Sequence, residues 1–308
     1  MQIDVVIPSW NRSELLAECL EHLARQPVPH QAIVADNASN DGTAEMVRSR
    51  FPDATLIELE ANLGFGRAVN RAVTAGSAEV IVVLNNDVFV ESSFLAEIVT
   101  PLEDASVGMV SAVLLDPKSG LIDAAGVEID ASLAGYAYMG GLPPVALEAP
   151  EDGLLGPCGG GAAYRRKAFE GVGGFDERIF VYSEDLELAL RIRAAGWRCA
   201  LAPRARGLHL GSATLGAQTV GQATHAARSR GYVLGRYRVS LLWLVLEAGA
   251  GLAHALVLRS AAPIRARLAG WREGRAASAR PVPEGAVSPR LSASRAFRRR
   301  LRAAFPRA

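Results

Sequence analysis

Cysteine is scarce in this chain of 308 residues: it occurs three times, at Cys19, Cys158 and Cys199. The number is odd and no pair has C-x-x-C spacing, so we expect neither a disulfide framework nor a structural zinc site. Three isolated thiols suit a reducing cytoplasm. The start of the chain shows no basic segment ahead of a short apolar stretch, so we expect no secretory signal, and no internal repeat is visible.

A glycine-rich phosphate loop is also missing. The first apolar run, Ile3 to Ile7, is typical of a buried strand, and Pro8-Ser9-Trp10-Asn11-Arg12 follows it. A dinucleotide-dependent oxidoreductase would carry G-x-G-x-x-G at this point, so the sequence argues strongly against that class. A nucleotidyltransferase would be expected to carry a Gly-rich loop with Lys or Arg here. That class is therefore kept only as an alternative.

The net charge of +1 conceals an uneven distribution of charge. From Arg259 to the end the chain has 13 Arg and two Glu, a balance of +11, whereas the preceding residues carry −10. An acidic body with a basic tail indicates an anionic partner for the tail, and a solvated, disordered tail is the alternative. Half of the residues are hydrophobic, which is typical of a folded globular protein. We expect no nucleic-acid partner.

Strand-like and helix-like patterns alternate through the first part of the chain. Such alternation predicts an α/β fold in which a mostly parallel sheet is covered by helices on both faces. The expected strands are Ile3 to Ile7, Ala32 to Ala35, Thr55 to Leu59 and Val80 to Leu84, and the expected helices are Ser13 to Arg25, Gly42 to Arg50 and Phe65 to Ala75.

Polar residues follow each of these strands. They are Asn11, Asp36-Asn37, Asn62 and Asn85-Asn86-Asp87. Because ligands of such sheets bind beyond the carboxyl ends of the strands, we expect a site there. Asp36 could accept a hydrogen bond from a base N–H, and Asp87 suits a divalent cation that bridges phosphates. Each motif alone could equally be a turn, where Asn and Asp are common.

Two further motifs lie later in the chain. Glu184-Asp185 begins an expected helix, Leu186 to Ala195, so the helix dipole or a role as general base could explain the pair. His209 follows a short strand-like run, where it could be structural or could bind an ion such as Mn²⁺.

Together these motifs resemble glycosyltransferase family 2, especially its bacterial rhamnosyltransferase-like branch. The match runs from about Ile3 to Ser212. It includes the Val6-Ile7-Pro8-Ser9-Trp10-Asn11, Asp36-Asn37-Ala38-Ser39, Asn62-Leu63-Gly64-Phe65-Gly66, Asn85-Asn86-Asp87, Gly173-Gly174-Phe175-Asp176, Glu184-Asp185 and His209 motifs.

The resemblance implies a GT-A fold, a Rossmann-like and mostly parallel sheet between helices, followed by a C-terminal helical extension. The catalytic domain is expected over 1–230, with a nucleotide-binding half at about 1–115 and an acceptor-binding half at about 116–230. An apolar helical extension over 231–273 and a basic, disordered tail over 274–308 are expected after it.

The resemblance also implies the roles of individual residues. Asp185 is expected to be the general base, with Glu184 beside it. Asp87 occupies the DXD position as the metal-binding carboxylate, and His209 is the second protein ligand. The nucleotide sugar is expected to contact Pro8, Trp10, Asn11, Asp36, Asn62, Gly64, Arg67, Asn86 and Asp87, and the acceptor to contact Gly159, Gly160 and Trp197.

The implied reaction is a single displacement with inversion, supported by Mg²⁺ or Mn²⁺. The donor is expected to be dTDP-rhamnose or a UDP-sugar, and the acceptor a hydroxyl of a glycan or a lipid-linked molecule. Asn85 stands where the motif's first Asp would be, which should weaken metal binding in the absence of substrate. A non-catalytic carbohydrate-binding or scaffold protein on the same fold is a further alternative.

The segment from Val239 to Leu258 is strongly apolar, although Glu247 and His254 interrupt it. Its length could span a bilayer, but the two polar residues and the Gly and Ala content favour a packed or membrane-surface helix. Because basic residues follow, we expect peripheral attachment to the inner face of the cell membrane. Packing on the catalytic domain or a dimer interface is the alternative.

Overall fold

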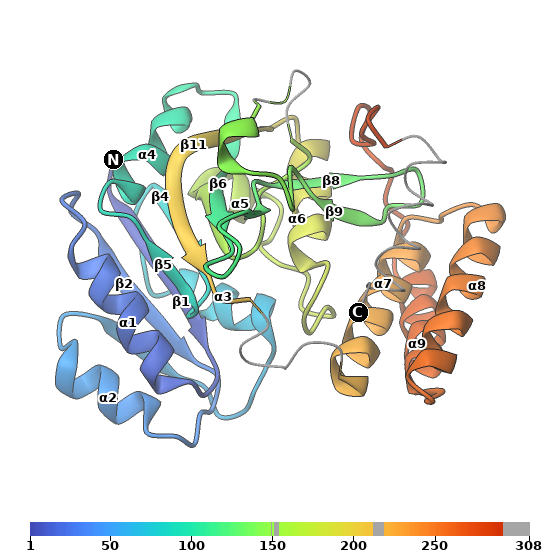
Figure 1. Cartoon of the computed structure of the whole chain (residues 1–308), viewed down its shortest axis with the longest axis horizontal. Helices are drawn as coiled ribbons and strands as arrows, with labels where there is room; N and C mark the ends of the chain where they lie inside the picture. Colours follow the sequence, from blue (N-terminus) through green and yellow to red (C-terminus); the bar gives the residue numbers. More distant parts are fainter. Residues whose placement is uncertain (149, 151–153, 212–218, 292–308) are drawn as a thin grey trace. The chain divides into compact units, whose positions relative to one another are not determined.

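The computed structural model describes the whole chain except residues 149, 151–153, 212–218 and 292–308. The chain divides into two compact units (Figure 1). Unit 1 contains Met1–Val127, Ala137–Phe180 and Glu184–Thr214, and unit 2 contains Glu128–Tyr136, Val181–Ser183 and Leu215–Ala308.

Within its described residues, unit 1 is built on a nine-stranded sheet with the order β3-β2-β1-β4-β10-β6-β11-β5, and β7 pairs with β6. All three neighbouring pairs from β3 to β4 are parallel, while β10 runs antiparallel to β4 and β6. The strands are β1 (Ile3–Ser9), β2 (Gln31–Asp36), β3 (Thr55–Glu58), β4 (Val80–Leu84), β5 (Val88–Val90), β6 (Val107–Leu115), β7 (Ile122–Ala124), β10 (Gly161–Arg165) and β11 (Arg198–His209). A separate two-stranded sheet pairs β8 (Val127–Ile129) with β9 (Gly135–Ala137).

Helices cover the sheet because its central strands are apolar on both faces. All seven residues of β1 and all five of β4 are buried. Val5 and Ile7 belong to the same core cluster as Leu16 of α1, and α3 packs on β1 and β2. This confirms the expected α/β fold with a mostly parallel sheet. The helices are α1 (Ser13–Ala24), α2 (Thr43–Arg50), α3 (Phe65–Val73), α4 (Phe94–Val99), α5 (Arg166–Gly171) and α6 (Glu184–Ala194), with short 3-10 turns η1 (Thr100–Glu103) and η2 (Pro144–Ala146).

In the described part of unit 2, three helices lie side by side in Figure 1: α7 (Val220–Arg236), α8 (Leu241–Val257) and α9 (Ala262–Ala276). Helices α7 and α9 approach each other through glycines. A Cβ added at Gly231 would lie 2.1 Å from the carbonyl oxygen of Arg267, and one at Gly270 would lie 2.0 Å from that of Arg228. The two backbones are therefore in direct contact, which larger side chains would prevent.

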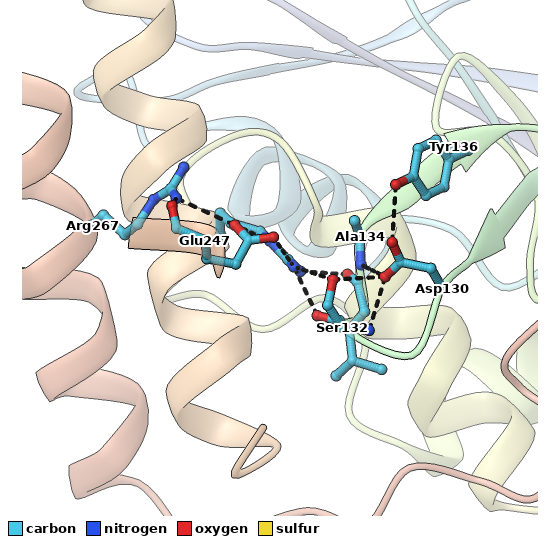
Figure 2. Close-up of polar contacts among 8 residues, drawn as sticks. Asp130, Ser132, Ala134, Tyr136, Glu247 and Arg267 are labelled. Carbon is cyan, nitrogen blue, oxygen red and sulfur yellow. Dashed lines mark hydrogen bonds and ion pairs between the residues drawn. The ribbon is translucent and has the colours of Figure 1, made fainter. Parts of the chain in front are cut away.

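Helix α8 turns its one acidic side chain inward. Glu247 is 6% exposed and pairs with Arg230 at 2.9 Å and with Arg267 at 3.2 Å (Figure 2). Arg230 also donates to the carbonyl oxygens of Ser132 and Leu133. In the same segment Asp130 accepts from the backbone N–H groups of Ser132 and Ala134 and from the Tyr136 hydroxyl, also shown in Figure 2.

The outer residues of α8 are apolar. Leu241, Val245, Leu252 and Val257 are between 55% and 75% exposed. The apolar segment expected from the sequence is thus a helix whose described side chains bury the charged group and expose the apolar ones. The side chain of His254 is not among the described residues. Across the residues with a described position, no helix combines the length and apolar character that a membrane crossing requires.

The expected division into a catalytic domain, a helical extension and a basic tail remains a proposal. Helix α7 runs from Val220 to Arg236, so it spans the expected end of the catalytic domain at residue 230. Of the expected tail, residues 274–276 belong to α9. The last 17 positions of the tail, 292–308, lie outside the described residues, and disorder there stays a prediction.

Candidate active site

The carboxyl ends of the parallel strands gather most of the residues singled out from the sequence. Strands β1, β2 and β4 are parallel, and β10 is antiparallel to both β4 and β6, so β6 and β11 run in the same direction as β4. Ser9, Asp36, Leu84 and His209 are the last residues of their strands. They therefore lie at one edge of the sheet, as expected for a ligand site in this architecture.

Asp87 and His209 meet at this edge through strand pairing. Asp87 precedes β5, and β5 pairs antiparallel with the end of β11, so that His209 lies opposite Val88. The backbone N–H of Leu210 also donates to the carbonyl oxygen of Asp87 at 3.1 Å. This pairing brings His209 Nε2 within 3.5 Å of Asp87 Oδ1. Both side chains are largely buried, with 17% and 7% of their surface exposed.

The other ring nitrogen of His209 contacts Asp123, a residue of β7. The Nδ1 to Oδ2 distance is 2.7 Å. Burial by itself would lower the pKa of His209, but the hydrogen bonds to Asp123 and Asp87 outweigh it and raise this pKa to about 9. The imidazole is therefore protonated at neutral pH, and an ion that binds it must displace a proton. Sequence reasoning missed Asp123 because no strand-end motif marks it.

Hydrogen bonds join the loops that follow β1 and β2 at this edge of the sheet. The backbone N–H of Asn11 donates to Ser39 Oγ at 2.7 Å, and Asn11 Oδ1 accepts from the N–H of Asn40 at 3.0 Å. Asp36 is 4% exposed and its Oδ1 accepts from the N–H of Ser39 at 3.1 Å. Asn11 itself has a left-handed backbone, with φ of 57°. Pro8 is buried at the end of β1, and Trp10 beside it is partly exposed.

Two buried asparagines extend this network. Asn37 accepts from the N–H of Leu63 at 2.8 Å and donates to the carbonyl oxygen of Gly64 at 3.1 Å, which ties the loop after β2 to the loop after β3. Asn86 donates to Ser9 Oγ at 3.0 Å, which ties the loop after β4 to β1. Sequence reasoning assigned no separate role to Asn37 or Ser9.

The loop before α3 packs tightly against the segment around Phe180. Asn62 Oδ1 accepts from the N–H of Gly64 at 3.0 Å. Gly64 has φ of 84°, and a Cβ there would lie 2.2 Å from the carbonyl oxygen of Phe180, so only glycine fits. Arg67 is half-exposed, and its Nε donates to the carbonyl oxygen of Glu177 at 2.8 Å.

A pair of glycines connects the loop after β4 with helix α6. The carbonyl oxygen of Gly160 accepts from the N–H of Asn85 at 3.1 Å. The N–H of Gly159 donates to Asp185 Oδ2 at 3.2 Å. The expected base and the segment that carries Asp87 are thus held by adjacent residues of one strand end.

Glu184 and Asp185 differ in burial. Glu184 is 7% exposed, and among the described residues its Oε2 has no hydrogen-bond partner, whereas Asp185 is only partly buried. Burial, followed by the charge of Asp185, raises the pKa of Glu184 to about 8. Burial also raises the pKa of Asp185, although backbone N–H groups of Leu186 and Gly159 oppose the shift. Asp185 is therefore the more accessible carboxylate of the pair.

The structure does not bring Trp197 to this group. Trp197 immediately precedes β11, whereas His209 ends that strand. Because β11 and β6 are parallel, with Arg198 opposite Val107, Trp197 lies at the amino ends of these strands. The Arg165 guanidinium lies over its ring, 5.9 Å from the centroid. Its expected contact with the acceptor finds no support in this position.

Asp87 and His209 suit a divalent ion whose coordination shell is filled by other ligands. Within the described chain no three His, Cys, Asp or Glu side chains form a metal cluster. Mg²⁺ typically takes one or two protein carboxylates, and phosphate and water complete a shell with bonds of ~2.1 Å. Adjacent ligands in such a shell lie ~3 Å apart, close to the 3.5 Å between Asp87 Oδ1 and His209 Nε2. The donor set therefore fits a divalent ion that takes its remaining ligands from phosphate or water.

Comparison with protein families identifies two overlapping matches. Residues 4–173, more than half of the chain, match the model of glycosyl transferase family 2. Residues 148–282 match the model of glycosyl transferase family group 2. The first match contains every expected nucleotide-side residue from Pro8 to Asp87, and the second contains Asp185 and His209.

Relatives with known names and solved structures agree with these families. The chain is 29% identical to the N-acetylglucosaminyl-diphospho-decaprenol L-rhamnosyltransferase of Mycobacterium tuberculosis over 279 residues, which cover 80% of this chain and 90% of that protein. It is 29% identical to the O-antigen biosynthesis protein RfbC of Myxococcus xanthus, covering 73% of this chain and 18% of RfbC. The mannosyltransferase PcManGT from Pyrobaculum calidifontis, solved with GDP-Man and Mn²⁺, superposes with a TM-score of 0.57 at 22% identity, covering 99% of this chain and 81% of that one.

Proposed function

We propose a mechanism that starts from the family of this chain, which belongs to glycosyl transferase family 2 in its rhamnosyltransferase-like branch. The chain is an inverting glycosyltransferase with a GT-A fold and a nucleotide-sugar donor. In the proposed mechanism Asp185 is the general base, and Asp87 and His209 hold a divalent metal at the donor diphosphate.

The observation that carries this proposal is the placement of Asp185. Its carboxylate is partly accessible and is held by the N–H of Gly159, next to the residue that holds Asn85. In the proposed step Asp185 takes the proton of the acceptor hydroxyl while the hydroxyl oxygen bonds to the anomeric carbon. The bond from that carbon to the diphosphate breaks on the opposite face, so the configuration inverts. A raised pKa makes a carboxylate a better base, and burial raises that of Asp185.

Glu184 has a supporting role in this proposal. It is buried, is adjacent to Asp185 in the sequence and has a pKa of about 8, so it is largely neutral at pH 7. A neutral neighbour lets Asp185 be ionised without a second buried charge beside it, because two adjacent carboxylates disfavour joint ionisation.

Asp87 supplies the carboxylate and His209 the imidazole for Mg²⁺ or Mn²⁺, the ion present in the PcManGT structure. When bound, the ion would act as a Lewis acid for the departing diphosphate. Asn86 keeps this segment in place through its bond to Ser9. Asn85 replaces the motif's first carboxylate, so the protein alone contributes little negative charge, and metal binding should depend on the nucleotide.

The donor is proposed to be a pyrimidine nucleotide sugar, dTDP-rhamnose or a UDP-sugar. Asp36 lies at the end of β2 with Oδ1 engaged by the N–H of Ser39, which fixes its orientation. A fixed carboxylate can accept the N3–H that uracil and thymine share. The mycobacterial relative is named as an L-rhamnosyltransferase, which favours dTDP-rhamnose. Pro8, Trp10, Asn11, Asn62, Gly64 and Arg67 are proposed to form the remainder of the nucleotide pocket.

The acceptor is proposed to be a glycan hydroxyl on a lipid-linked diphosphate, because the name of the mycobacterial relative specifies such an acceptor. Gly159 and Gly160, beside Asp185, are proposed to face it. The exposed apolar residues of α8 and the basic C-terminal segment suit peripheral attachment to an anionic membrane surface, where this acceptor resides.

A transfer assay with purified full-length protein tests the proposal. The protein is incubated with dTDP-rhamnose, UDP-sugars or GDP-mannose and a synthetic lipid-diphosphate N-acetylglucosamine acceptor, with Mn²⁺ or Mg²⁺. We expect one pyrimidine donor to be consumed with formation of an inverted glycoside, and the Asp185→Asn variant to be inactive. Binding of nucleotide sugar without transfer or hydrolysis under any of these conditions would contradict the proposed reaction.

A further inference from the structure

Asp123 contacts His209 but belongs to none of the motifs on which the proposed function rests. The distance from His209 Nδ1 to Asp123 Oδ2 is 2.7 Å, shorter than the 3.5 Å from Nε2 to Asp87 Oδ1. The two nitrogens are on opposite sides of the imidazole ring. Asp123 therefore cannot share an ion with Nε2, and its role concerns the ring itself.

A carboxylate accepts hydrogen bonds and donates none, so Nδ1 of His209 carries the proton in this contact. Because Nδ1 keeps its proton in this contact, the proton that a binding ion displaces is the one on Nε2, which leaves a lone pair on the nitrogen that faces Asp87. If the ring turned over about the Cβ–Cγ bond, the carbons Cε1 and Cδ2 would take the places of Nε2 and Nδ1, and neither Asp87 nor Asp123 would have a ring nitrogen facing it. The contact with Asp123 thus selects both the tautomer and the orientation that point a ligand at Asp87.

Strand β7 holds Asp123 firmly. Its neighbours Ile122 and Ala124 are 1% and 9% exposed, and β7 pairs antiparallel with β6. The carboxylate itself is 44% exposed, so Asp123 is the outward-facing residue of β7 and reaches His209 from outside the core. A group placed on a strand keeps its position better than one on a loop, which suits a positioning residue.

From this geometry we propose that Asp123 is a positioning residue: it holds the imidazole of His209 so that Nε2 is directed at the divalent ion bound by Asp87. The inference rests on the metal role proposed above for Asp87 and His209. It adds a residue that contacts neither the substrate nor the ion and acts through His209 alone.

The test compares Mn²⁺ binding by four proteins: the wild type, Asp123→Ala, Asp123→Asn and His209→Ala. Binding is measured by electron paramagnetic resonance with UDP or dTDP present. Asp104→Asn is the matched control, because Asp104 is a half-exposed carboxylate of the same unit that pairs with Arg198. We expect Asp123→Ala to weaken Mn²⁺ binding 10–100-fold, the usual effect of losing such a partner. Asp123→Asn keeps an acceptor and should lose less, and Asp104→Asn should match the wild type.

Nuclear magnetic resonance of the ring nitrogens of His209 gives a readout that does not depend on activity. In the Mn²⁺-free protein at high pH, the wild type should show the Nδ1–H tautomer, and Asp123→Ala should show a mixture. If His209→Ala weakens Mn²⁺ binding while both Asp123 variants bind as the wild type does, the inference fails and the metal role stands. If the wild type binds no Mn²⁺ with either nucleotide, the metal role fails and this inference with it.

Discussion

Asp185 and Gly159 are joined by a hydrogen bond of 3.2 Å, from the backbone N–H of the glycine to Oδ2 of the carboxylate. The next residue, Gly160, accepts the N–H of Asn85. One short segment therefore sets the position of the proposed base relative to the loop that carries Asp87. A general base needs to lie within about 3 Å of the oxygen whose proton it removes, so this anchoring would bear directly on the proposed reaction.

The Asp185→Asn variant should lose transfer and keep donor binding. The amide retains the shape of the side chain but cannot take the acceptor proton. General-base catalysis contributes about 10²–10⁴-fold, so kcat should fall by that factor while the Kd of the nucleotide sugar changes less than about twofold. The measurements are steady-state transfer and calorimetric titration, with Asp104→Asn as the control. Retention of more than about a tenth of kcat would remove Asp185 from the role of base.

The pH dependence of stability should change in Glu184→Gln. The folded-state pKa of Glu184, about 8, lies above the usual glutamate pKa of 4.5, so between these pH values the folded protein keeps a proton that the unfolded chain has released. Stability from this group is complete below pH 4.5 and declines as pH rises towards 8, by up to about 1.4 kcal/mol per pH unit. Glutamine stays neutral and lacks the decline.

Urea unfolding of both proteins at pH 5, 6 and 7 checks this. The difference in unfolding free energy should grow with pH in favour of the variant. A difference that stays constant across the three pH values would mean that Glu184 is ionised in the folded protein.

Activity should require a divalent cation, and loss of Asp87 should reduce activity more than loss of His209. Asp87→Ala loses the only charged protein ligand and should raise the Mn²⁺ concentration for half-maximal transfer at least tenfold. His209→Ala should be milder, because phosphate and water supply the remaining ligands. The measurement is a Mn²⁺ titration of transfer after treatment with EDTA. Full activity in EDTA would contradict the role of the metal, and a misfolded His209→Ala protein would favour a structural role for His209.

The glycine contact between α7 and α9 should be sensitive to one methyl group. In Gly270→Ala the new Cβ would lie 2.0 Å from the carbonyl oxygen of Arg228, so the helices must separate, at a cost of about 1–3 kcal/mol. Gly249→Ala in α8 is the matched control, since its Cβ meets nothing within 4 Å. That variant should stabilise the helix by about 0.4–1 kcal/mol. Thermal unfolding followed by circular dichroism should show opposite shifts, and equal shifts would contradict the close packing.

Membrane attachment should depend on the outer face of α8. Leu241 and Val245 are 75% and 62% exposed, so the double change to serine removes apolar surface without opening a core. Flotation of full-length protein with anionic vesicles should fall at least tenfold in this variant and should fall with added salt. The same double change at Leu142 and Val145, exposed residues of unit 1, is the control. If all three proteins float equally, or if none of them floats, the apolar face of α8 does not bind membranes, and a protein partner would be its alternative ligand.

Local patterns in the sequence were sufficient for the fold class and for most of the strand-end residues. A fully apolar run such as Val80–Leu84 needs cover on both faces wherever it lies, so it predicts a central strand without further information. Asp36, Asn86 and Asp87 follow such runs directly, and the carboxyl ends of parallel strands necessarily share an edge. Glu184 and Asp185 were equally recognisable from the sequence, because they are adjacent residues at the start of one helix.

Only the tertiary structure decided which distant residues meet. Asp87 and His209 come together because β5 pairs with the end of β11, and Asp123 reaches the same ring because β7 pairs with β6. Trp197, at the other end of β11, is kept away by the direction of that strand. Register and strand direction result from the packing of the whole sheet, and a single segment contains no record of its partner. The sequence therefore determined the kinds of groups at the edge, and the sheet determined their neighbours.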